Sequence, residues 1–224
     1  MNNIKGIIFD LDGLLIDTEV LVNKAIHKMG VDIFSKEIPE TFFIERSGLN
    51  RMDSHKLLSM YIDIKISETE FSEIFDRYFM KILKKRINCK TGCMELLEFL
   101  EKHNIPKAIA TSSETNLAYY KLEQAGIDVK RFSCLIGADE VKHRKPAPDV
   151  YLLAASRMEI KPEDCLALED SYHGVKSAVS ANIKVICVPD IKPPCEEMQK
   201  LSMHIFPSLH KVKDYCNHNR FALI

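Results

Sequence analysis

Short apolar runs alternate along the chain with longer stretches in which apolar residues recur at helical spacing. The runs are too short for a substantial helix and predict strands. These runs lie at 4–9, 107–110, 132–136, 165–168 and 184–188. Helical spacing predicts helices at 94–103, before Gly126, from Asp149 and at 171–181. Strands that alternate with helices predict an α/β fold with a parallel sheet.

The region between the first two predicted strands has no strong strand signal and is expected to be helical. Apolar residues spaced at i, i+3, i+4 and i+7 predict a helix that begins after Asp17 or Thr18 and stops at Gly30. Further helices are expected at 39–46, 51–61 and 67–85. Ser67 and Glu70 have the spacing of a capping box. Beyond Cys195 the pattern predicts only a helix at 196–201 and a weak strand at 203–206.

Length and composition indicate an ordinary globular protein. The chain has 224 residues, 46% of them hydrophobic and 28% charged, with a net charge of -1. The near-zero net charge gives no sign of a basic surface that would bind nucleic acid. No apolar run approaches the length of a membrane span. Met1 leads almost at once into the first strand, so no secretory signal is expected. Seven scattered cysteines suggest reduced thiols and a cytoplasmic location.

The end of the first predicted strand carries the clearest chemical signal, Asp10-Leu11-Asp12-Gly13. Side chains two apart on a strand point the same way, so the two acids leave the strand together. Neighbouring carboxylates repel each other unless a cation or a shared proton compensates. At the carboxyl edge of an open parallel sheet, a divalent metal is the natural partner. One alternative is an acidic turn that only caps the next helix. A calcium loop of the EF-hand kind is excluded, because its glycine would come later and a helix, not a strand, would precede it.

Three later stretches add chemistry. Thr111 follows the second strand, where its hydroxyl and the next helix could bind a phosphoryl oxygen or simply cap that helix. Lys145 is followed by Pro146 and Pro148, which stiffen the backbone around it. It could be a fixed cation of the site or a solvated surface lysine. Glu169 and Asp170 end another strand, and strand-end carboxylates from one sheet edge can meet at one Mg²⁺.

Together, these four stretches resemble the signatures of the haloacid dehalogenase-like (HAD) phosphohydrolases, and more narrowly the beta-phosphoglucomutase-like branch. The likeness spans about residues 4 to 190. It implies a Rossmann-like parallel core, residues 1–16 and 88–224, with an inserted helical cap domain at 17–87. It also implies that Gly174 matches the glycine that follows the acids in this family.

The same resemblance implies a role for each site residue. Asp10 would be the nucleophile and Asp12 the general acid and base. The Mg²⁺ would be held by Asp10, by the backbone carbonyl of Asp12, and by Asp170, with Glu169 as a ligand or just behind it. Lys145 would balance charge. The remaining positions would bind substrate, and they are Thr111, Ser112 and Arg51. For Arg51, a surface arginine at a helix start is the alternative.

The function expected from these residues is a Mg²⁺-dependent phosphatase, a monomer, that acts on a small phosphorylated metabolite. A phosphosugar mutase is the alternative, but Val22 stands where beta-phosphoglucomutases have a cap histidine, and Glu114 where they have a phosphate-binding lysine. A dehalogenase fits less well, since such enzymes do without the metal site. A binding protein without catalysis would not need the full set of acids. The substrate stays open among sugar phosphates, nucleotide-derived phosphates and phosphoglycolate.

Overall fold

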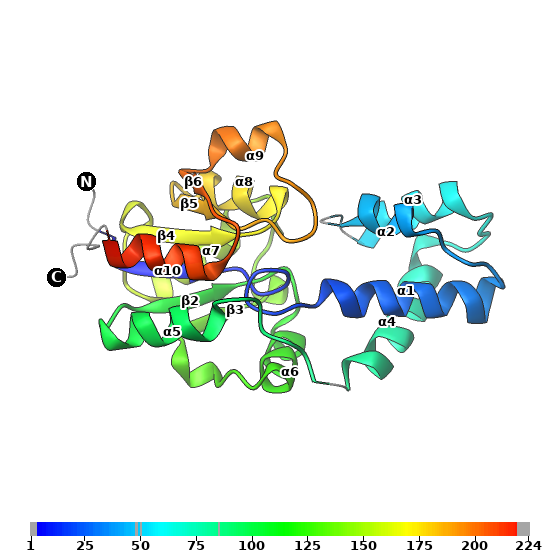
Figure 1. Ribbon diagram of the computed structural model, residues 1–224, viewed down its shortest axis with the longest axis horizontal. Coiled ribbons are helices and arrows are strands. Elements are labelled where there is room, and N and C mark those ends of the chain that lie inside the picture. Colours follow the sequence, from blue (N-terminus) through cyan, green and yellow to red (C-terminus); the bar gives the residue numbers. More distant parts are fainter. Residues whose placement is uncertain (1–3, 48, 50, 85, 219–224) are drawn as a thin grey trace. The chain divides into compact units, whose positions relative to one another are not determined.

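The computed structural model describes residues 4–47, 49, 51–84 and 86–218, and they form two compact units (Figure 1). Unit 1 comprises residues 1–17 and 88–224, and unit 2 comprises residues 18–87. Each unit has its own buried apolar residues. Among the described residues, no helix is both long and apolar enough to cross a bilayer.

Unit 1 is built on a six-stranded parallel sheet with the strand order β3-β2-β1-β4-β5-β6. Its strands are β1 (Gly6–Phe9), β2 (Lys107–Ala110), β3 (Cys134–Ile136), β4 (Cys165–Glu169), β5 (Lys184–Cys187) and β6 (His204–Ile205). Strand β1 is central and pairs with β2 on one side and β4 on the other. Because all strands run the same way, their carboxyl ends meet at one edge. The expected α/β fold with a parallel sheet is confirmed.

Helices cover this sheet and bury its apolar side chains. They are α5 (Cys93–Lys102), α6 (Thr115–Ala125), α7 (Asp149–Arg157), α8 (Tyr172–Ser180), α9 (Glu196–Leu201) and α10 (Leu209–His218). One core cluster joins Ile8 of β1 and Ala167 of β4 to residues of α7 and α8, among them Val150 and Val175. Burial of such side chains, at about 25 cal/mol per Å² of apolar surface, is what holds the layers together.

The described residues of unit 2 form four helices: α1 (Glu19–Phe34), α2 (Glu40–Arg46), α3 (Arg51–Tyr61) and α4 (Glu68–Leu83). Helix α4 buries a stripe of Phe71, Phe75 and Phe79, whose rings stack in succession. The Ser67 hydroxyl accepts from the Glu70 amide and the Glu70 carboxylate accepts from the Ser67 amide, which confirms the capping box.

Two of the predicted boundaries were wrong, and one helix was missed. Helix α1 does not stop at Gly30 but continues to Phe34, and Ser35 ends it in the left-handed conformation. The third strand begins at Cys134, because Phe132 follows a 3-10 turn and packs its ring edge-on against Phe9. Helix α10 was not predicted at all. The helix at 51–61 and the strand at 107–110 have the predicted bounds.

Candidate active site

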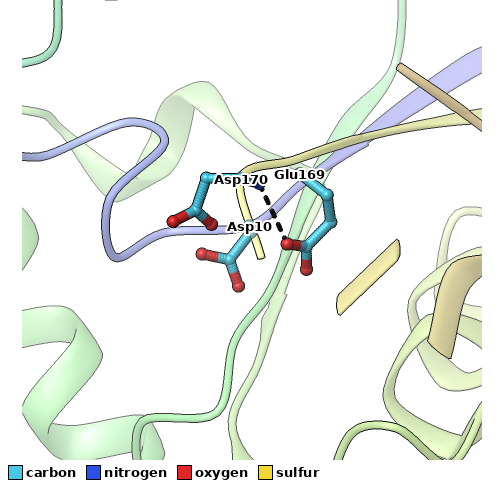
Figure 2. Close-up of side chains that lie close together, drawn as sticks. All are labelled: Asp10, Glu169 and Asp170. Atoms are coloured by element: carbon cyan, nitrogen blue, oxygen red, sulfur yellow. Dashed lines mark hydrogen bonds between the residues drawn. The ribbon is translucent and has the colours of Figure 1, made fainter. Parts of the chain in front are cut away.

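The acids predicted at different strand ends come together at the carboxyl edge of the sheet. Asp10 follows β1, and its amide donates to the Leu168 carbonyl of β4. Glu169 ends β4 and Asp170 follows it. Figure 2 shows the three carboxylates pointing toward one another. Each offers one oxygen, and these oxygens all lie within 4.8 Å of one another.

Lys145 is the cation at the centre of this cluster. Its Nζ lies 2.6 Å from Asp10 Oδ1 and 2.6 Å from Glu169 Oε1, and it also donates to the Ala110 carbonyl at 2.9 Å. The lysine side chain is only 3% exposed. The loop that carries it is tied to α8, because the Ser177 hydroxyl donates to the Ala147 carbonyl at 2.6 Å. Lys145 is therefore a fixed, buried cation rather than a solvated surface lysine.

Glu169 is held on both of its oxygens. Oε1 accepts from Lys145 and, at 2.8 Å, from the Tyr151 hydroxyl, while Oε2 accepts from the Asp170 amide and from the amide and hydroxyl of Ser171. The residue is completely buried. The start of α8 packs so closely against this carboxylate that a Cβ on Gly174 would lie 1.8 Å from Glu169 Oε1. Glu169 thus orients Lys145, and its oxygens have little capacity left for another partner.

Burial raises the pKa of Asp10 to about 7, although Lys145 pulls that pKa down, and Glu169 and Asp12 push it further up. The pKa of Asp170 is raised well above its usual value, first by burial and then by the charges of Asp10, Glu169 and Asp190. For Lys145, burial disfavours the charged form, but Asp10 and Glu169 outweigh it and raise the pKa. The acids therefore lack enough positive charge nearby to ionise freely.

Asp12 lies beside this cluster and has partners of its own. Its Oδ1 lies 2.7 Å from Lys121 Nζ, and its Oδ2 accepts from the Ser113 hydroxyl at 2.8 Å. Lys121 Nζ also contacts the Ser113 oxygen at 2.8 Å. Lys121 comes from α6 and is only 5% exposed. Sequence reasoning missed this lysine, although a cation next to the buried Ala118 and Leu122 on a helix was a usable signal.

The predicted substrate-binding residues are divided between the two units. Thr111 is buried after β2, and its hydroxyl accepts from the Ser113 amide at 3.1 Å. Ser112 is exposed. Arg51 is in unit 2, where it pairs with Asp76 at 2.8 Å and lies over the Phe75 ring. Their roles toward a substrate stay predictions.

The residues fit a divalent cation by charge. The site of unit 1 contains five carboxyl groups and three ammonium groups, so two carboxyl groups have no ammonium group to balance them. These groups are Asp10, Asp12, Glu169, Asp170 and Asp190 with Lys90, Lys121 and Lys145. The Asp170 carboxylate makes no hydrogen bond or ion pair with the described part of the chain. Oxygen ligands at a site with two excess carboxyl groups suit a hard ion such as Mg²⁺.

Gly13 allows the backbone to turn close to these acids. Its φ is +86°, which a residue with a side chain rarely adopts, and a Cβ there would lie 2.3 Å from Asp170 Oδ2. The glycine of the first motif is therefore required both for the turn and for the approach of Asp170.

Comparison with known proteins agrees with this geometry. The family model for haloacid dehalogenase-like hydrolase matches residues 7–188. A phosphorylated carbohydrates phosphatase of Thermotoga maritima is 30% identical over 182 residues, which cover 81% of this chain and 83% of that protein. A probable pseudouridine-5'-phosphatase of Drosophila melanogaster is 33% identical over 188 residues, 82% of this chain and 80% of that one.

A solved structure shows the same fold over the whole length. It is a HAD family hydrolase from Deinococcus radiodurans with bound phosphate and sodium, and it covers 100% of this chain and 99% of its own, with a TM-score of 0.82 at 21% identity. The motifs at the sheet edge, the match over residues 7–188 and the two relatives lead to one assignment. The chain belongs to the haloacid dehalogenase-like hydrolase family.

Proposed function

We propose that the protein is a Mg²⁺-dependent phosphatase that hydrolyses a small phosphorylated metabolite through an aspartyl-phosphate intermediate. The observation that carries this proposal is the convergence of Asp10 and Asp170 on one point beside the buried Lys145. The names of the two relatives, a phosphatase of phosphorylated carbohydrates and one of pseudouridine 5'-phosphate, support phosphomonoesters of sugar-like alcohols as the substrate class.

In the first step, a carboxylate oxygen of Asp10 attacks phosphorus while the bond to the leaving oxygen breaks. Asp12 gives that oxygen a proton, so the leaving group departs as an alcohol. In the second step Asp12 takes a proton from water, the water oxygen attacks the phosphorus, and the Asp10–phosphorus bond breaks. Phosphate leaves, and both aspartates return to their starting forms.

Other residues balance charge and hold the reacting groups. Lys145 keeps the Asp10 carboxylate oriented and, with the Thr111 hydroxyl, faces the negative oxygens of the phosphoryl group. Asp10, Asp170 and the Asp12 carbonyl would hold Mg²⁺, which supplies positive charge to the same oxygens. Unit 2 would serve as the cap domain that recognises the leaving group, with Arg51 as a candidate contact. We also propose that the protein works as a monomer and in the cytoplasm.

The experiment is a phosphate-release assay on a panel of phosphometabolites with and without Mg²⁺. We expect turnover of sugar-like phosphomonoesters that EDTA abolishes. Asp10→Asn should be inactive while its fold persists, because an amide cannot attack phosphorus. Substantial activity of purified Asp10→Asn would rule out the covalent route, and full activity in EDTA would rule out the metal.

A further inference from the structure

Asp190 is a buried acid that the proposed mechanism does not use. It follows β5, and its side chain is only 8% exposed. One carboxylate oxygen, Oδ1, forms an ion pair with Lys90. The other, Oδ2, is buried and has no hydrogen-bond partner among the described residues. A buried carboxylate oxygen without a partner is unfavourable, so such an atom calls for an explanation.

The unpartnered oxygen lies next to the acidic cluster. Strands β4 and β5 are neighbours in the sheet, and the Val188 amide donates to the Glu169 carbonyl at 2.7 Å. Asp170 and Asp190 therefore leave adjacent strands at the same edge. A Cβ placed on Gly13 would lie 2.3 Å from Asp170 Oδ2 and 3.4 Å from Asp190 Oδ2, so both oxygens face the same point.

Asp190 is nevertheless too far away to be one of the direct ligands. The described residues give one group of carboxylates with oxygens within 4.8 Å of one another, and it contains Asp10, Glu169 and Asp170 but not Asp190. Mg²⁺ requires oxygens at about 2.0–2.1 Å and usually retains several waters. A carboxylate just beyond the direct ligands is suited to accept a hydrogen bond from one of those waters.

We propose that Asp190 Oδ2 accepts a hydrogen bond from a water bound to the divalent cation that Asp10 and Asp170 hold. This inference rests on the metal of the proposed function. Asp190 is thus a positioning residue for the metal, and its other oxygen, Oδ1, pairs with Lys90. Lys90 is itself anchored, because its amide donates to the Leu15 carbonyl at 2.9 Å, in the segment that follows the first motif.

The test is calorimetric titration of the full-length protein with Mg²⁺ in the absence of substrate. We expect Asp190→Asn and Asp190→Ala to weaken Mg²⁺ binding about tenfold or more, the range seen when outer partners of a metal site are removed. Asp164→Asn is the matched control. It removes an acid of the same unit that is paired with a lysine, Lys5 at 2.9 Å, but precedes β4 at the opposite edge of the sheet. Its Mg²⁺ affinity should equal that of the wild type.

Lys90→Met separates the hydrogen bond from simple charge. It removes one charge of the same ion pair but leaves Oδ2 in place, so the Mg²⁺ affinity should change less than about threefold. If charge alone mattered, Lys90→Met would tighten binding by as much as Asp190→Asn weakens it, and that symmetric result would overturn the inference. So would wild-type Mg²⁺ affinity in folded Asp190→Ala, whose side chain has no acceptor. If the wild type itself bound no Mg²⁺, the proposed function would fail instead, which keeps the two failures distinct.

Discussion

Lys121 Nζ lies 2.7 Å from Asp12 Oδ1, and the Ser113 hydroxyl contacts both residues. The lysine is buried, so its ammonium is exposed to little water and is stabilised by contacts such as these. The contact fixes the carboxylate of the proposed acid and base in one orientation. It explains a buried lysine on α6 that sequence reasoning left without a role.

Lys121→Met should lower kcat at least tenfold with little change in KM, because Asp12 would lose the contact that positions it. The loss in kcat/KM, which reports formation of the aspartyl-phosphate, should be large for an alkyl phosphate and small for p-nitrophenyl phosphate, whose leaving group departs without a proton. Steady-state kinetics on both substrates measures this difference. Lys130→Met, at an exposed lysine, is the control and should behave as wild type. Equal losses of kcat/KM on both substrates would contradict the positioning role.

Gly174→Ala should remove activity through Glu169. A Cβ at this position would lie 1.8 Å from Glu169 Oε1, so the carboxylate that orients Lys145 must move. Overpacking of this kind costs about 1–3 kcal/mol, and we expect kcat to fall about a hundredfold or more. Thermal unfolding and phosphate release measure the two effects.

Gly126→Ala provides the comparison for this variant. Nothing lies within 4 Å of a Cβ there, but φ is +72°, so the variant should lose stability through backbone strain and keep its activity. A Gly174→Ala variant that resembled it, unstable but active, would show that the orientation of Glu169 does not matter for turnover.

Glu101 should contribute to stability at neutral pH and lose that contribution in acid. Hydrogen bonds from Arg131 at 2.7 and 2.9 Å, and then from Lys107, lower its pKa from 4.5 to about 2. A lowered folded pKa means that the stabilisation is complete above pH 4.5 and disappears as the pH falls toward 2. The carboxylate is 38% exposed, so solvent screening limits it to about 0.5–1 kcal/mol.

The measurement is urea unfolding of Glu101→Gln and wild type at pH 7 and near pH 2. The variant should be less stable at pH 7, and the difference should vanish near pH 2. Glu98→Gln, an exposed position on the same helix, should show a much smaller difference at pH 7. A difference that persists at pH 2 would mean that packing, and not charge, explains the effect.

The strands and the acids at their ends were predictable because both are local signals. A short apolar run followed by Asp10 or Glu169 needs no knowledge of the fold. Gly30 misled the prediction, since glycine usually ends helices. Here it lies within α1 and makes room for Ile38, whose Cδ1 would be 2.6 Å from a Cβ at that position. Local sequence cannot show a tertiary contact of this kind.

Helix α10 and Asp190 were missed for related reasons. The buried face of α10 has only Leu209, Val212 and Cys216, and the rest of the helix is polar, so its apolar period is faint. It is stabilised by packing against α5, which the sequence does not reveal. Asp190 follows an apolar strand as Asp10 does, but only the fold shows that it lies beside Asp170.

The last prediction separates a phosphatase from a mutase. A mutase must keep water away from its phospho-aspartate until the sugar intermediate has rebound, and the cap histidine of beta-phosphoglucomutases is thought to tie acid–base activation to the correct sugar. The sequence resemblance puts Val22 of α1 at that position, and a valine can neither donate nor accept a proton. Asp12 should therefore activate water as soon as the first leaving group departs, and hydrolysis should prevail.

Incubation with beta-glucose 1-phosphate, Mg²⁺ and a trace of glucose 1,6-bisphosphate should accordingly yield inorganic phosphate rather than glucose 6-phosphate. Both products can be followed in one reaction, and Asp10→Asn should form neither. Val22→His tests whether the missing cap histidine is the cause. If the missing histidine is what permits hydrolysis, this variant should release phosphate more slowly from the same ester. Rapid formation of glucose 6-phosphate by the wild type, with little free phosphate, would instead identify the protein as a mutase, because only rebinding of the intermediate moves the phosphoryl group to the second hydroxyl.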